Sequence, residues 1–190
     1  MNKGNINMKA SKMAVLAGLV TMMAAGSAMA ASPLVVTGSS VNFTGEVTDG
    51  ACAITVNSVD QTVKLAIVPA SSIVKGATPK QLTPFYITLE NCAVDTYTTA
   101  SFDFAGASVD AGVALDNIAT QNKALGVGVQ LLDSANKVIN IGTTGQGAKM
   151  NLAAGTSNTA SFKAGIYGTA VGGITSGSVV ALTNFNIRYE

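Results

Sequence analysis

The sequence ends with LTNFNIRYE (Leu182–Glu190), a stretch in which apolar and polar residues alternate. One alternating set is apolar and comprises Phe185, Ile187 and Tyr189. The other set is polar and comprises Asn184, Asn186 and Arg188. A period of two predicts a β-strand with one face toward a core and the other toward water. No further strand follows in the sequence, so this strand is expected to have an open edge, which proteins normally cover because an unpaired apolar edge invites aggregation.

Short strand-like runs separated by turn residues fill the chain upstream of this stretch. The runs span residues 41–47, 51–57, 61–68, 84–91, 99–106, 125–133, 137–142, 159–169 and 178–190. Turn residues such as Asp49-Gly50 and Asp110–Gly112 lie between them, and PASSIV (Pro69–Val74) is expected to form a single helical turn. Many short strands with regular turns, and no internal repeat, predict one all-β sandwich domain.

The first 30 residues have the layout of a secretory signal peptide. The segment begins with three separated lysines, Lys3, Lys9 and Lys12. An uncharged run follows from Met13 to Ala25, and Ala28-Met29-Ala30 forms a small-x-small cleavage site. The alternative is a membrane anchor, since residues 13–30 are about long enough to span a bilayer. Cleavage after Ala30 would leave residues 31–190, which are sufficient for one domain with a core.

The charge of the remaining chain argues against nucleic-acid and anionic membrane partners. Three of the eleven basic residues lie in the predicted signal peptide, leaving eight against ten acidic residues. The remaining lysines form no cluster: they are Lys64, Lys75, Lys80, Lys123, Lys137, Lys149 and Lys163. A scattered distribution of this kind provides no basic surface for a polyanion.

The chain has two cysteines, Cys52 and Cys92, and no histidine. An even number of cysteines in an exported chain predicts a disulfide, here closing a loop of about 40 residues. The alternatives are two free thiols or half of a metal site. A zinc site would lack ligands, because the chain has neither histidine nor further cysteine.

Catalysis is not expected from this composition. Without histidine, Ser-His and Cys-His nucleophilic sites are excluded. The acidic residues are dispersed, and several occupy turns, where aspartate commonly makes local hydrogen bonds: Asp49, Asp60 and Asp110. GTTGQGAKM (Gly142–Met150) resembles a phosphate-binding loop, but Ala148 separates the last glycine from the lysine and no Ser or Thr follows. We interpret it as a surface turn.

A second alternation lies near the start of the chain, in SPLVVTGSSVNFTGEV (Ser32–Val47). One set of alternating residues comprises Val35, Thr37, Ser39, Val41 and Phe43. Periodicity alone leaves two interpretations open. The segment is either the first strand of the same molecule or an extension whose side chains enter a groove elsewhere.

Several motifs in order along the chain carry a family resemblance. They are VNFTGEVTDGACAITVNSVDQTVKL (Val41–Leu65), LENC (Leu89–Cys92), GVGVQLLDSANKVI (Gly126–Ile139) and the penultimate tyrosine of NIRYE. Within the first motif, six residues separate Gly45 from Cys52, and SVDQTV follows at Ser58–Val63. Behind a signal peptide, this arrangement resembles the structural subunits of chaperone–usher pili, especially the major subunit of type 1 fimbriae.

The resemblance implies an incomplete immunoglobulin-like β-sandwich that lacks its last strand. Residues 1–30 would be a cleaved signal peptide, residues 31–44 an N-terminal donor-strand extension, and residues 45–190 the pilin domain. Cys52 and Cys92 would form the family disulfide. In this family a chaperone first fills the groove left by the missing strand. The extension of the next subunit then replaces the chaperone by β-strand addition.

The resemblance also assigns roles to individual residues. The side chains that would point into the acceptor groove of a neighbour are Val35, Thr37, Ser39, Val41 and Phe43. Phe185, Ile187 and Tyr189 would line one side of the acceptor groove and dock the chaperone's strand, and basic residues of the chaperone would hold the Glu190 carboxylate. Ser39 stands where the family usually has glycine, with Gly38 beside it, which affects the donor register.

The implied function is that of a structural subunit of a bacterial surface pilus, exported through the periplasm. It would polymerise head to tail, as the major rod subunit of a fimbria that supports adhesion. The implied partners are identical or related pilin subunits, a periplasmic chaperone and an outer-membrane usher, with no cofactor, metal or small-molecule substrate. The alternatives are a minor adaptor subunit, a lectin-type adhesin, for which residues 31–190 leave no room, and a self-complete secreted β-sandwich that acts as a binding module.

Overall fold

The structure is a computed structural model, and it describes residues 40–45, 47, 51–145 and 147–190. The chain divides into two units, Met1–Gly45 and Glu46–Glu190. In the first unit, residues 40–45 have no regular secondary structure, and all their side chains are exposed. The predicted signal peptide and the predicted donor residues Val35, Thr37 and Ser39 lie outside the described residues.

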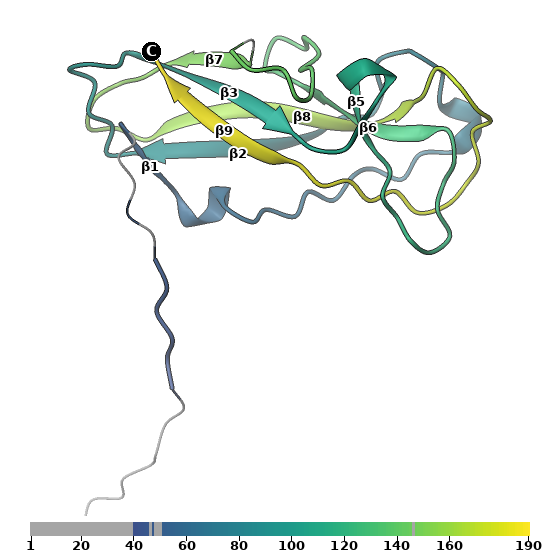
Figure 1. Cartoon of the computed structure of the whole chain (residues 1–190), viewed down its shortest axis with the longest axis horizontal. Coiled ribbons are helices and arrows are strands. Elements are labelled where there is room, and N and C mark those ends of the chain that lie inside the picture. Colours follow the sequence, from purple (N-terminus) through teal and green to yellow (C-terminus); the bar gives the residue numbers. More distant parts are fainter. Residues whose placement is uncertain (1–39, 46, 48–50, 146) are drawn as a thin grey trace, which may run out of the picture. The chain divides into compact units, whose positions relative to one another are not determined.

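The second unit is built from two antiparallel β-sheets (Figure 1). The six-stranded sheet has the order β1 (Ala53–Ile54), β2 (Thr83–Glu90), β8 (Asn158–Gly168), β6 (Val127–Leu132), β5 (Ala114–Asp116) and β4 (Ser108–Val109). The three-stranded sheet has the order β7 (Ala148–Asn151), β3 (Thr99–Ala105) and β9 (Asn184–Tyr189). The short 3-10 turns are η1 (Val56–Ser58), η2 (Ala70–Ser72) and η3 (Asp110–Gly112). The predicted all-β class is therefore confirmed.

Phenylalanines from both sheets form the centre of the core. The ring of Phe162 on β8 lies 5.3 Å from that of Phe85 on β2, its neighbour in the same sheet. The same ring lies 5.4 Å from Phe102 and 5.2 Å from Phe104, which both come from β3 in the other sheet. Phe102, Phe104 and Phe162 are at most 2% exposed. Aromatic pairs in edge-to-face and offset geometry add to the free energy of apolar burial, so this cluster holds the two sheets together.

Cys52 and Cys92 form a disulfide, which confirms the predicted pair. The bond joins the residue before β1 to the end of the turn that follows β2, and both cysteines are 5% exposed. The buried side chain of Asn158 packs beside it, with its amide nitrogen 3.4 Å from the Cys92 Sγ atom. The same amide group bonds to both the N–H and the carbonyl oxygen of Ala153, so it also fixes the turn that leads into β8.

The secondary structure differs from the sequence-based prediction in several segments. The segment at residues 61–68 forms no strand. In the predicted strand at 178–190, only the part from Asn184 onward belongs to β9. The predicted strand at 137–142 is reduced to an isolated bridge between Val138 and Leu132. The short strands β4 and β5 were not predicted, because two or three residues are too few to show a period. The helical turn expected at Pro69–Val74 is confirmed by η2. No helix in the described part of the chain is long and apolar enough to cross a membrane.

Candidate functional site: the open edge of the last strand

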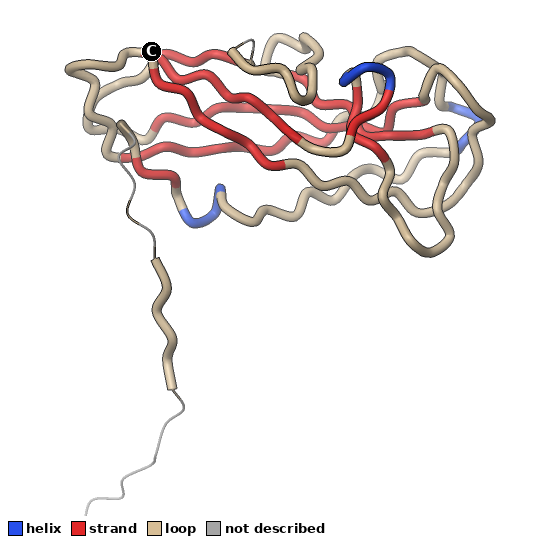
Figure 2. Tube along the Cα trace, in the orientation of Figure 1, coloured by secondary structure: helices blue, strands red, loops and turns tan. Residues whose placement is uncertain are grey.

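Strand β9 lies at the edge of the three-stranded sheet (Figures 1 and 2). On one side it pairs with β3 in a six-residue register, from Ala105 opposite Asn184 to Ala100 opposite Tyr189. Within the described residues, no strand pairs with its other side. The predicted open edge is therefore present in the folded domain.

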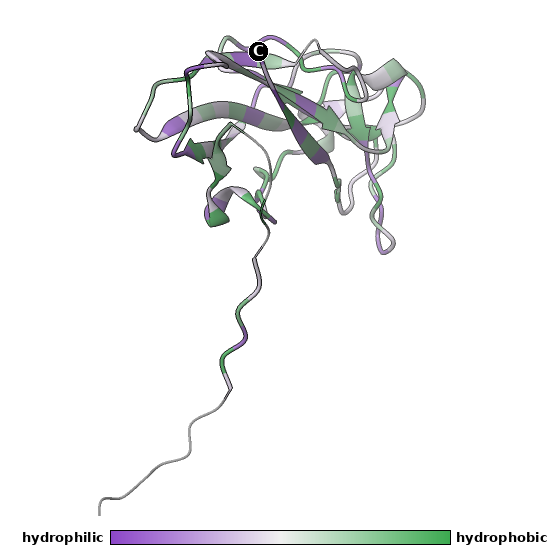
Figure 3. Ribbon diagram, turned by 60° about the vertical axis from the view of Figure 1, so that its left-hand side comes forward, coloured by the Kyte–Doolittle hydropathy of each residue, from purple (hydrophilic) through white to green (hydrophobic). Residues whose placement is uncertain are grey.

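The inward-facing side chains of this strand are apolar and only partly covered. Phe185, Ile187 and Tyr189 are half-buried and pack against the core, whereas the intervening polar residues are exposed. The alternation continues upstream of the strand, where Val179 and Ala181 also pack against the core. The alternation of apolar and polar residues along the strands can be followed in Figure 3. The result is an apolar stripe along the open edge, as the sequence predicted.

Tyr189 connects the end of this stripe to the disulfide. Its hydroxyl donates a long hydrogen bond, 3.5 Å, to the carbonyl oxygen of Cys52. Its ring centroid lies 6.3 Å from that of Tyr97. Burial raises the pKa of the Tyr189 hydroxyl, and the hydrogen bond to Cys52 opposes that effect in part. At neutral pH the side chain is therefore a neutral apolar ring with one polar contact.

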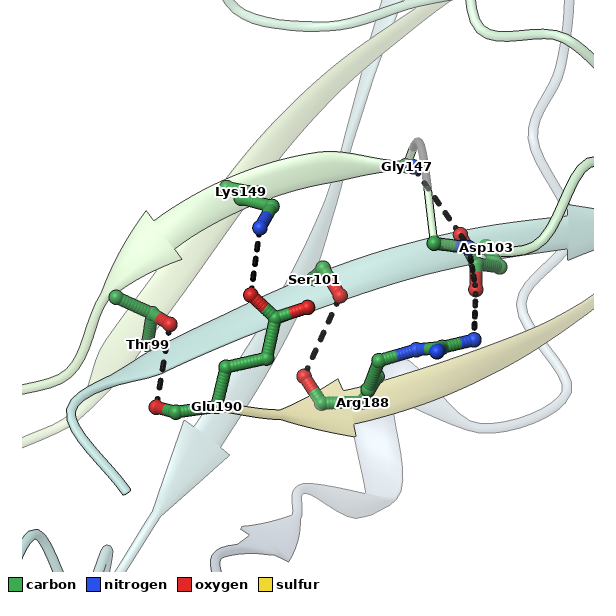
Figure 4. Close-up of polar contacts among 8 residues, drawn as sticks. Thr99, Ser101, Asp103, Gly147, Lys149, Arg188 and Glu190 are labelled. Carbon is green, nitrogen blue, oxygen red and sulfur yellow. Dashed lines mark hydrogen bonds and ion pairs between the residues drawn. The ribbon is translucent and has the colours of Figure 1, made fainter.

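The opposite face of the three-stranded sheet is held by a buried carboxylate (Figure 4). Asp103 on β3 is 5% exposed and accepts a hydrogen bond of 3.3 Å from the Arg188 guanidinium on β9. It also accepts bonds from the backbone N–H groups of Gly145, at 3.0 and 3.1 Å, and Gly147, at 3.1 Å. One side chain thus joins β3, β9 and the loop before β7.

This arrangement explains why the loop at Gly142–Met150 resembles a phosphate-binding loop. Its glycine N–H groups do surround an anion, but that anion is the protein's own Asp103 carboxylate. Gly147 lies so close to the carbonyl group of Phe102 that a Cβ atom would collide with it. Residues 142–145 and 147 form turns, bends or irregular chain, as expected, whereas Ala148–Met150 belong to strand β7, so the interpretation as a turn was wrong for these three residues.

Glu190 is held within its own chain. Its main-chain oxygen accepts hydrogen bonds from the backbone N–H groups of Thr98, at 2.9 Å, and Thr99, at 3.0 Å. Its side-chain carboxylate forms an ion pair with Lys149 on β7, in an exposed position (Figure 4). The last residue therefore extends the pairing of β9 with β3, and its side chain remains at the surface.

Two side chains near η1, those of Ser58 and Gln61, bond to the backbone of β2, and the sequence did not predict this contact. The N–H group of Thr88 donates to the Ser58 hydroxyl at 2.8 Å, and the Gln61 side-chain amide donates to the Tyr86 carbonyl oxygen at 2.8 Å. These side chains satisfy backbone groups on the edge of β2 that a paired strand would otherwise use. Residues 61–68 then continue without strand pairing, and Leu65 packs against the core. The only sequence signal was the SVDQTV motif that contains both residues.

An open depression of about 840 Å³ lies between β2 and the chain from Ile54 to Lys64, and its lining includes Tyr86 and Gln61. No group of three or more acidic or cysteine residues in the described ranges is arranged to hold a metal ion.

The structure brings some of the predicted site residues together and leaves others apart. Phe185, Ile187 and Tyr189 share one face of β9, with Glu190 directly after it. The predicted donor residues Val41 and Phe43 belong to the first unit, where they are 73% and 88% exposed. They make up the described part of the alternating set near the start of the chain.

Comparison with known proteins identifies a family. The model of the family described as fimbrial protein matches residues 41–190. The type-1 fimbrial protein A chain of Escherichia coli strain K12 is 32% identical over 187 residues, which cover 96% of this chain and all of that protein. The major MR/P fimbria protein of Proteus mirabilis strain HI4320 is 31% identical over 183 residues, again covering 96% of this chain and all of the relative.

A solved structure supports the fold. The P pilus rod subunit PapA superposes with a TM-score of 0.62 at 20% identity, covering 74% of this chain and all of that one. Together with the two-sheet architecture and the unpaired edge of β9, this likeness confirms an immunoglobulin-like sandwich that lacks a strand. The chain therefore belongs to the fimbrial protein family, whose members are subunits of fimbriae on the cell surface.

Proposed function

We propose that this chain is the major rod subunit of a chaperone–usher pilus and that it polymerises by donor-strand exchange. Residues 31–44 of one copy would pair with the open edge of β9 in the next copy. The observation that carries the proposal is the half-buried apolar stripe of Phe185, Ile187 and Tyr189 beside an edge that no described strand covers. The same chain supplies an extension whose Val41 and Phe43 are exposed.

Strand addition would pair the open edge of β9 and bury the exposed apolar side chains of the extension in the same step. Backbone hydrogen bonds to β9 would supply affinity, and alternate side chains of the extension would complete the core. Full burial of a side chain such as Val41 or Phe43 contributes about 1.5–3 kcal/mol. Because donor and acceptor are different surfaces of the same chain, the contact is head-to-tail and generates a filament rather than a closed dimer.

The donor register follows from the alternation. Val35, Thr37 and Ser39 would continue the set that contains Val41 and Phe43. A shift of one residue would turn this whole set away from the groove. Ser39 replaces the glycine usual in the family, and its small side chain suits a shallow pocket. The proposed domain boundaries, 31–44 for the extension and 45–190 for the pilin domain, place Gly45 at the junction.

Segment 61–68 would form the second side of the acceptor groove. Ser58 and Gln61 occupy the edge of β2, so this segment is free of strand pairing, and Leu65 packs against the core as Ile187 does. A donor strand would then have a backbone partner on each side. The donor strand would then supply the backbone hydrogen bonds that residues 61–68 do not make to any strand in the isolated domain.

A periplasmic chaperone and an outer-membrane usher are the assembly partners that we propose. An apolar strand edge exposed before assembly would promote aggregation, so a chaperone strand has to cover it until the next subunit arrives. Basic residues of the chaperone would take over the Glu190 carboxylate from Lys149. In this role the chain acts as a structural component rather than an enzyme and requires no cofactor.

The test compares the pilin domain with and without a donor strand. We would prepare residues 44–190 with the disulfide formed, and measure thermal unfolding with a synthetic peptide of residues 31–45. A matched control peptide would carry Val41→Asn and Phe43→Asn. A ligand at 100 times its Kd stabilises the folded state by about 2.7 kcal/mol, so a large upward shift in Tm is expected with the native peptide alone. A domain that is already stable and indifferent to the peptide would identify a self-complete binding module instead.

The proposed major role has its own test. Cells that lack this chain but retain the other pilus genes should show no rods by electron microscopy. Rods of normal length and number would assign the chain to a minor adaptor position. Restoring the chain from a plasmid controls for effects on neighbouring genes.

A further inference from the structure

Five exposed apolar side chains lie on the loops that precede β9 in space or in sequence. They are Ile118 (42% exposed), Leu125 (56%), Val171 (78%), Val180 (51%) and Leu182 (69%), and together they form what we call the end patch. They come from the loop between β5 and β6, the loop after β8, and the segment that leads into β9. Figure 1 shows these loops at the end of the sandwich away from the C-terminal end of β9.

A buried asparagine fixes the loops that carry the end patch. Asn117 is 0% exposed. Its side-chain nitrogen donates to the carbonyl oxygens of Ala124 and Ser178, both at 2.9 Å. Its side-chain oxygen accepts from the N–H groups of Ala119, at 3.1 Å, and Val180, at 2.9 Å. All four hydrogen-bonding positions of the side chain are used, so the two loops are joined at a defined geometry.

Hydrogen bonds tie two of the patch residues, Ile118 and Leu125, to the segment that leads into β9. The N–H group of Ile118 donates to the carbonyl oxygen of Val180 at 2.7 Å. Leu125 donates to the Thr175 hydroxyl at 2.9 Å, and the N–H group of Thr175 donates back to the Leu125 carbonyl oxygen at 3.2 Å. A surface ordered in this way loses little conformational entropy when it binds a partner. The end patch is therefore pre-organised apolar surface rather than a set of loose loop tips.

The direction of the added donor strand determines at which end of β9 the donor's own domain lies. Every strand pair in the described sheets is antiparallel. Antiparallel pairing is also slightly more stable per residue than parallel pairing. A donor strand antiparallel to β9 ends where β9 begins. The C-terminal end of the donor extension, at Thr44, would therefore arrive near the start of β9 in the acceptor.

The donor's own domain cannot be far from that point. Seven residue steps separate Gly45 from Cys52, and at about 3.3–3.6 Å per residue they span at most about 25 Å. We infer that the end patch packs against the domain of the neighbouring copy that donates the strand, an inference that rests on the proposed function. The patch is then a second contact in the same head-to-tail junction.

The part of the donor's domain nearest to this junction is the end that contains the disulfide, because the domain begins just before Cys52. Tyr97 lies there, 42% exposed, and it contacts Tyr189, whose hydroxyl reaches Cys52. The exposed residue Asp95 is in the same loop, and the exposed Lys123 lies beside the end patch. An aromatic ring and a carboxylate thus face aliphatic side chains and an ammonium group, which is complementary in both polarity and charge.

Photo-crosslinking in assembled fimbriae tests this contact on the full chain. A photo-reactive amino acid placed at residue 182 should crosslink to residues 91–97 of another copy, as located by mass spectrometry. The same probe at residue 43 should crosslink to β9 of another copy and reports only on strand exchange. A probe at Tyr86, on the outer face of β2, serves as the surface control.

The two probes separate the two proposals. Crosslinks from residue 43 to β9, with crosslinks from residue 182 only to the donor strand at residues 43–45 or with none from residue 182 at all, would overturn the end-patch contact and leave strand exchange standing. Absence of crosslinks from both probes in intact filaments would overturn strand exchange and the end-patch contact together. Crosslinks from residue 182 to residues 91–97 support the contact.

A substitution gives an independent measurement. Leu182→Ser removes an exposed side chain, so the Tm of the chaperone-bound subunit should not change. If the end patch is buried in the filament, the substitution should raise the fraction of subunits released from filaments by about tenfold or more, the effect expected when a leucine loses its burial. Tyr86→Ser, outside the patch, should leave release unchanged. Filaments of Leu182→Ser with the same release as wild type would contradict the inference.

Discussion

The Asp103 carboxylate on β3 and the Arg188 guanidinium on β9 are 3.3 Å apart, and the same carboxylate binds the N–H groups of Gly145 and Gly147. The two kinds of contact differ in burial. The Asp103 side chain is 6% exposed, whereas that of Arg188 is 48% exposed. The part-buried N–H groups of the two glycines should therefore depend on Asp103 more than the half-exposed guanidinium does.

The first prediction follows from that difference. Asp103→Asn places an amide nitrogen or an uncharged oxygen against the glycine N–H groups, and should lower the free energy of unfolding by about 1–3 kcal/mol. Arg188→Gln removes only a partly exposed pair and should cost less than about 1 kcal/mol. Urea unfolding of both variants measures the difference. Equal losses would show that the ion pair, rather than the glycine N–H groups, fixes the loop.

Tyr189 should act through its ring rather than its hydroxyl. Tyr189→Ala removes part of the apolar stripe on β9, so capture by a chaperone should weaken and periplasmic levels of the subunit should fall. Tyr189→Phe keeps the ring and loses only the 3.5 Å hydrogen bond to Cys52, so levels should stay close to wild type. Immunoblotting of periplasmic extracts distinguishes the two. Unchanged levels in the alanine variant would argue against β9 as the docking strand.

The disulfide should contribute strongly to the stability of the domain. Cys52 and Cys92 are 40 residues apart, and closing a loop of that length stabilises the folded state by about 4 kcal/mol in the loop-entropy treatment. Cys52→Ser should therefore unfold at much lower denaturant concentration and be degraded faster in the periplasm. The double variant Cys52→Ser with Cys92→Ser controls for reactivity of the remaining thiol. Normal folding and assembly of both variants would show that the bond is dispensable.

Stability should fall in alkaline solution. Burial raises the pKa of Tyr189 above its ordinary value of 10.0, and burial together with the nearby Asp110 raises that of Tyr167. The folded state therefore holds these protons more tightly than the unfolded state does. The stabilisation is complete below about pH 10 and is lost as the pH rises from there through the raised values. Unfolding between pH 8 and 11 should show this decline, and Tyr167→Phe should reduce it.

Asn117 should be among the most sensitive polar positions. Asn117→Leu would leave the buried carbonyl oxygen of Ala124 and the N–H group of Val180 without their side-chain partner, and would remove one of the two hydrogen bonds to the Ser178 carbonyl oxygen. An unsatisfied buried group costs about 1–3 kcal/mol, so a loss of at least about 3 kcal/mol is expected. Chemical denaturation gives the value, and Asn122→Ser in the neighbouring exposed turn provides the comparison. A loss below 1 kcal/mol would mean that the loops are held by other contacts.

Local patterns in the sequence were sufficient for several features of the fold. The alternation of Phe185, Ile187 and Tyr189 predicted both the strand and its inward face, because side-chain direction in a strand depends only on residue parity. The cysteine count predicted the disulfide, and PASSIV predicted η2. The family resemblance added the missing strand, which periodicity within one chain cannot show.

Other features depended on contacts between distant residues. Segment 61–68 has strand-like composition but forms no strand, because Ser58 and Gln61 occupy the edge of β2 and no described strand pairs with it. The glycine-rich loop resembles an anion site in sequence, and only the fold places Asp103, some forty residues earlier, inside it.

The sequence by itself therefore determined the strand faces, the sulfur pairing and the apolar character of β9, since these follow from parity, composition and residue chemistry. Only the tertiary structure decided which segments pair with one another, which carboxylate fills the loop and which loops carry the exposed apolar residues. The reason is physical: hydrogen-bond pairing and burial depend on which segments meet in space, and in this domain those segments are separated by tens of residues along the chain.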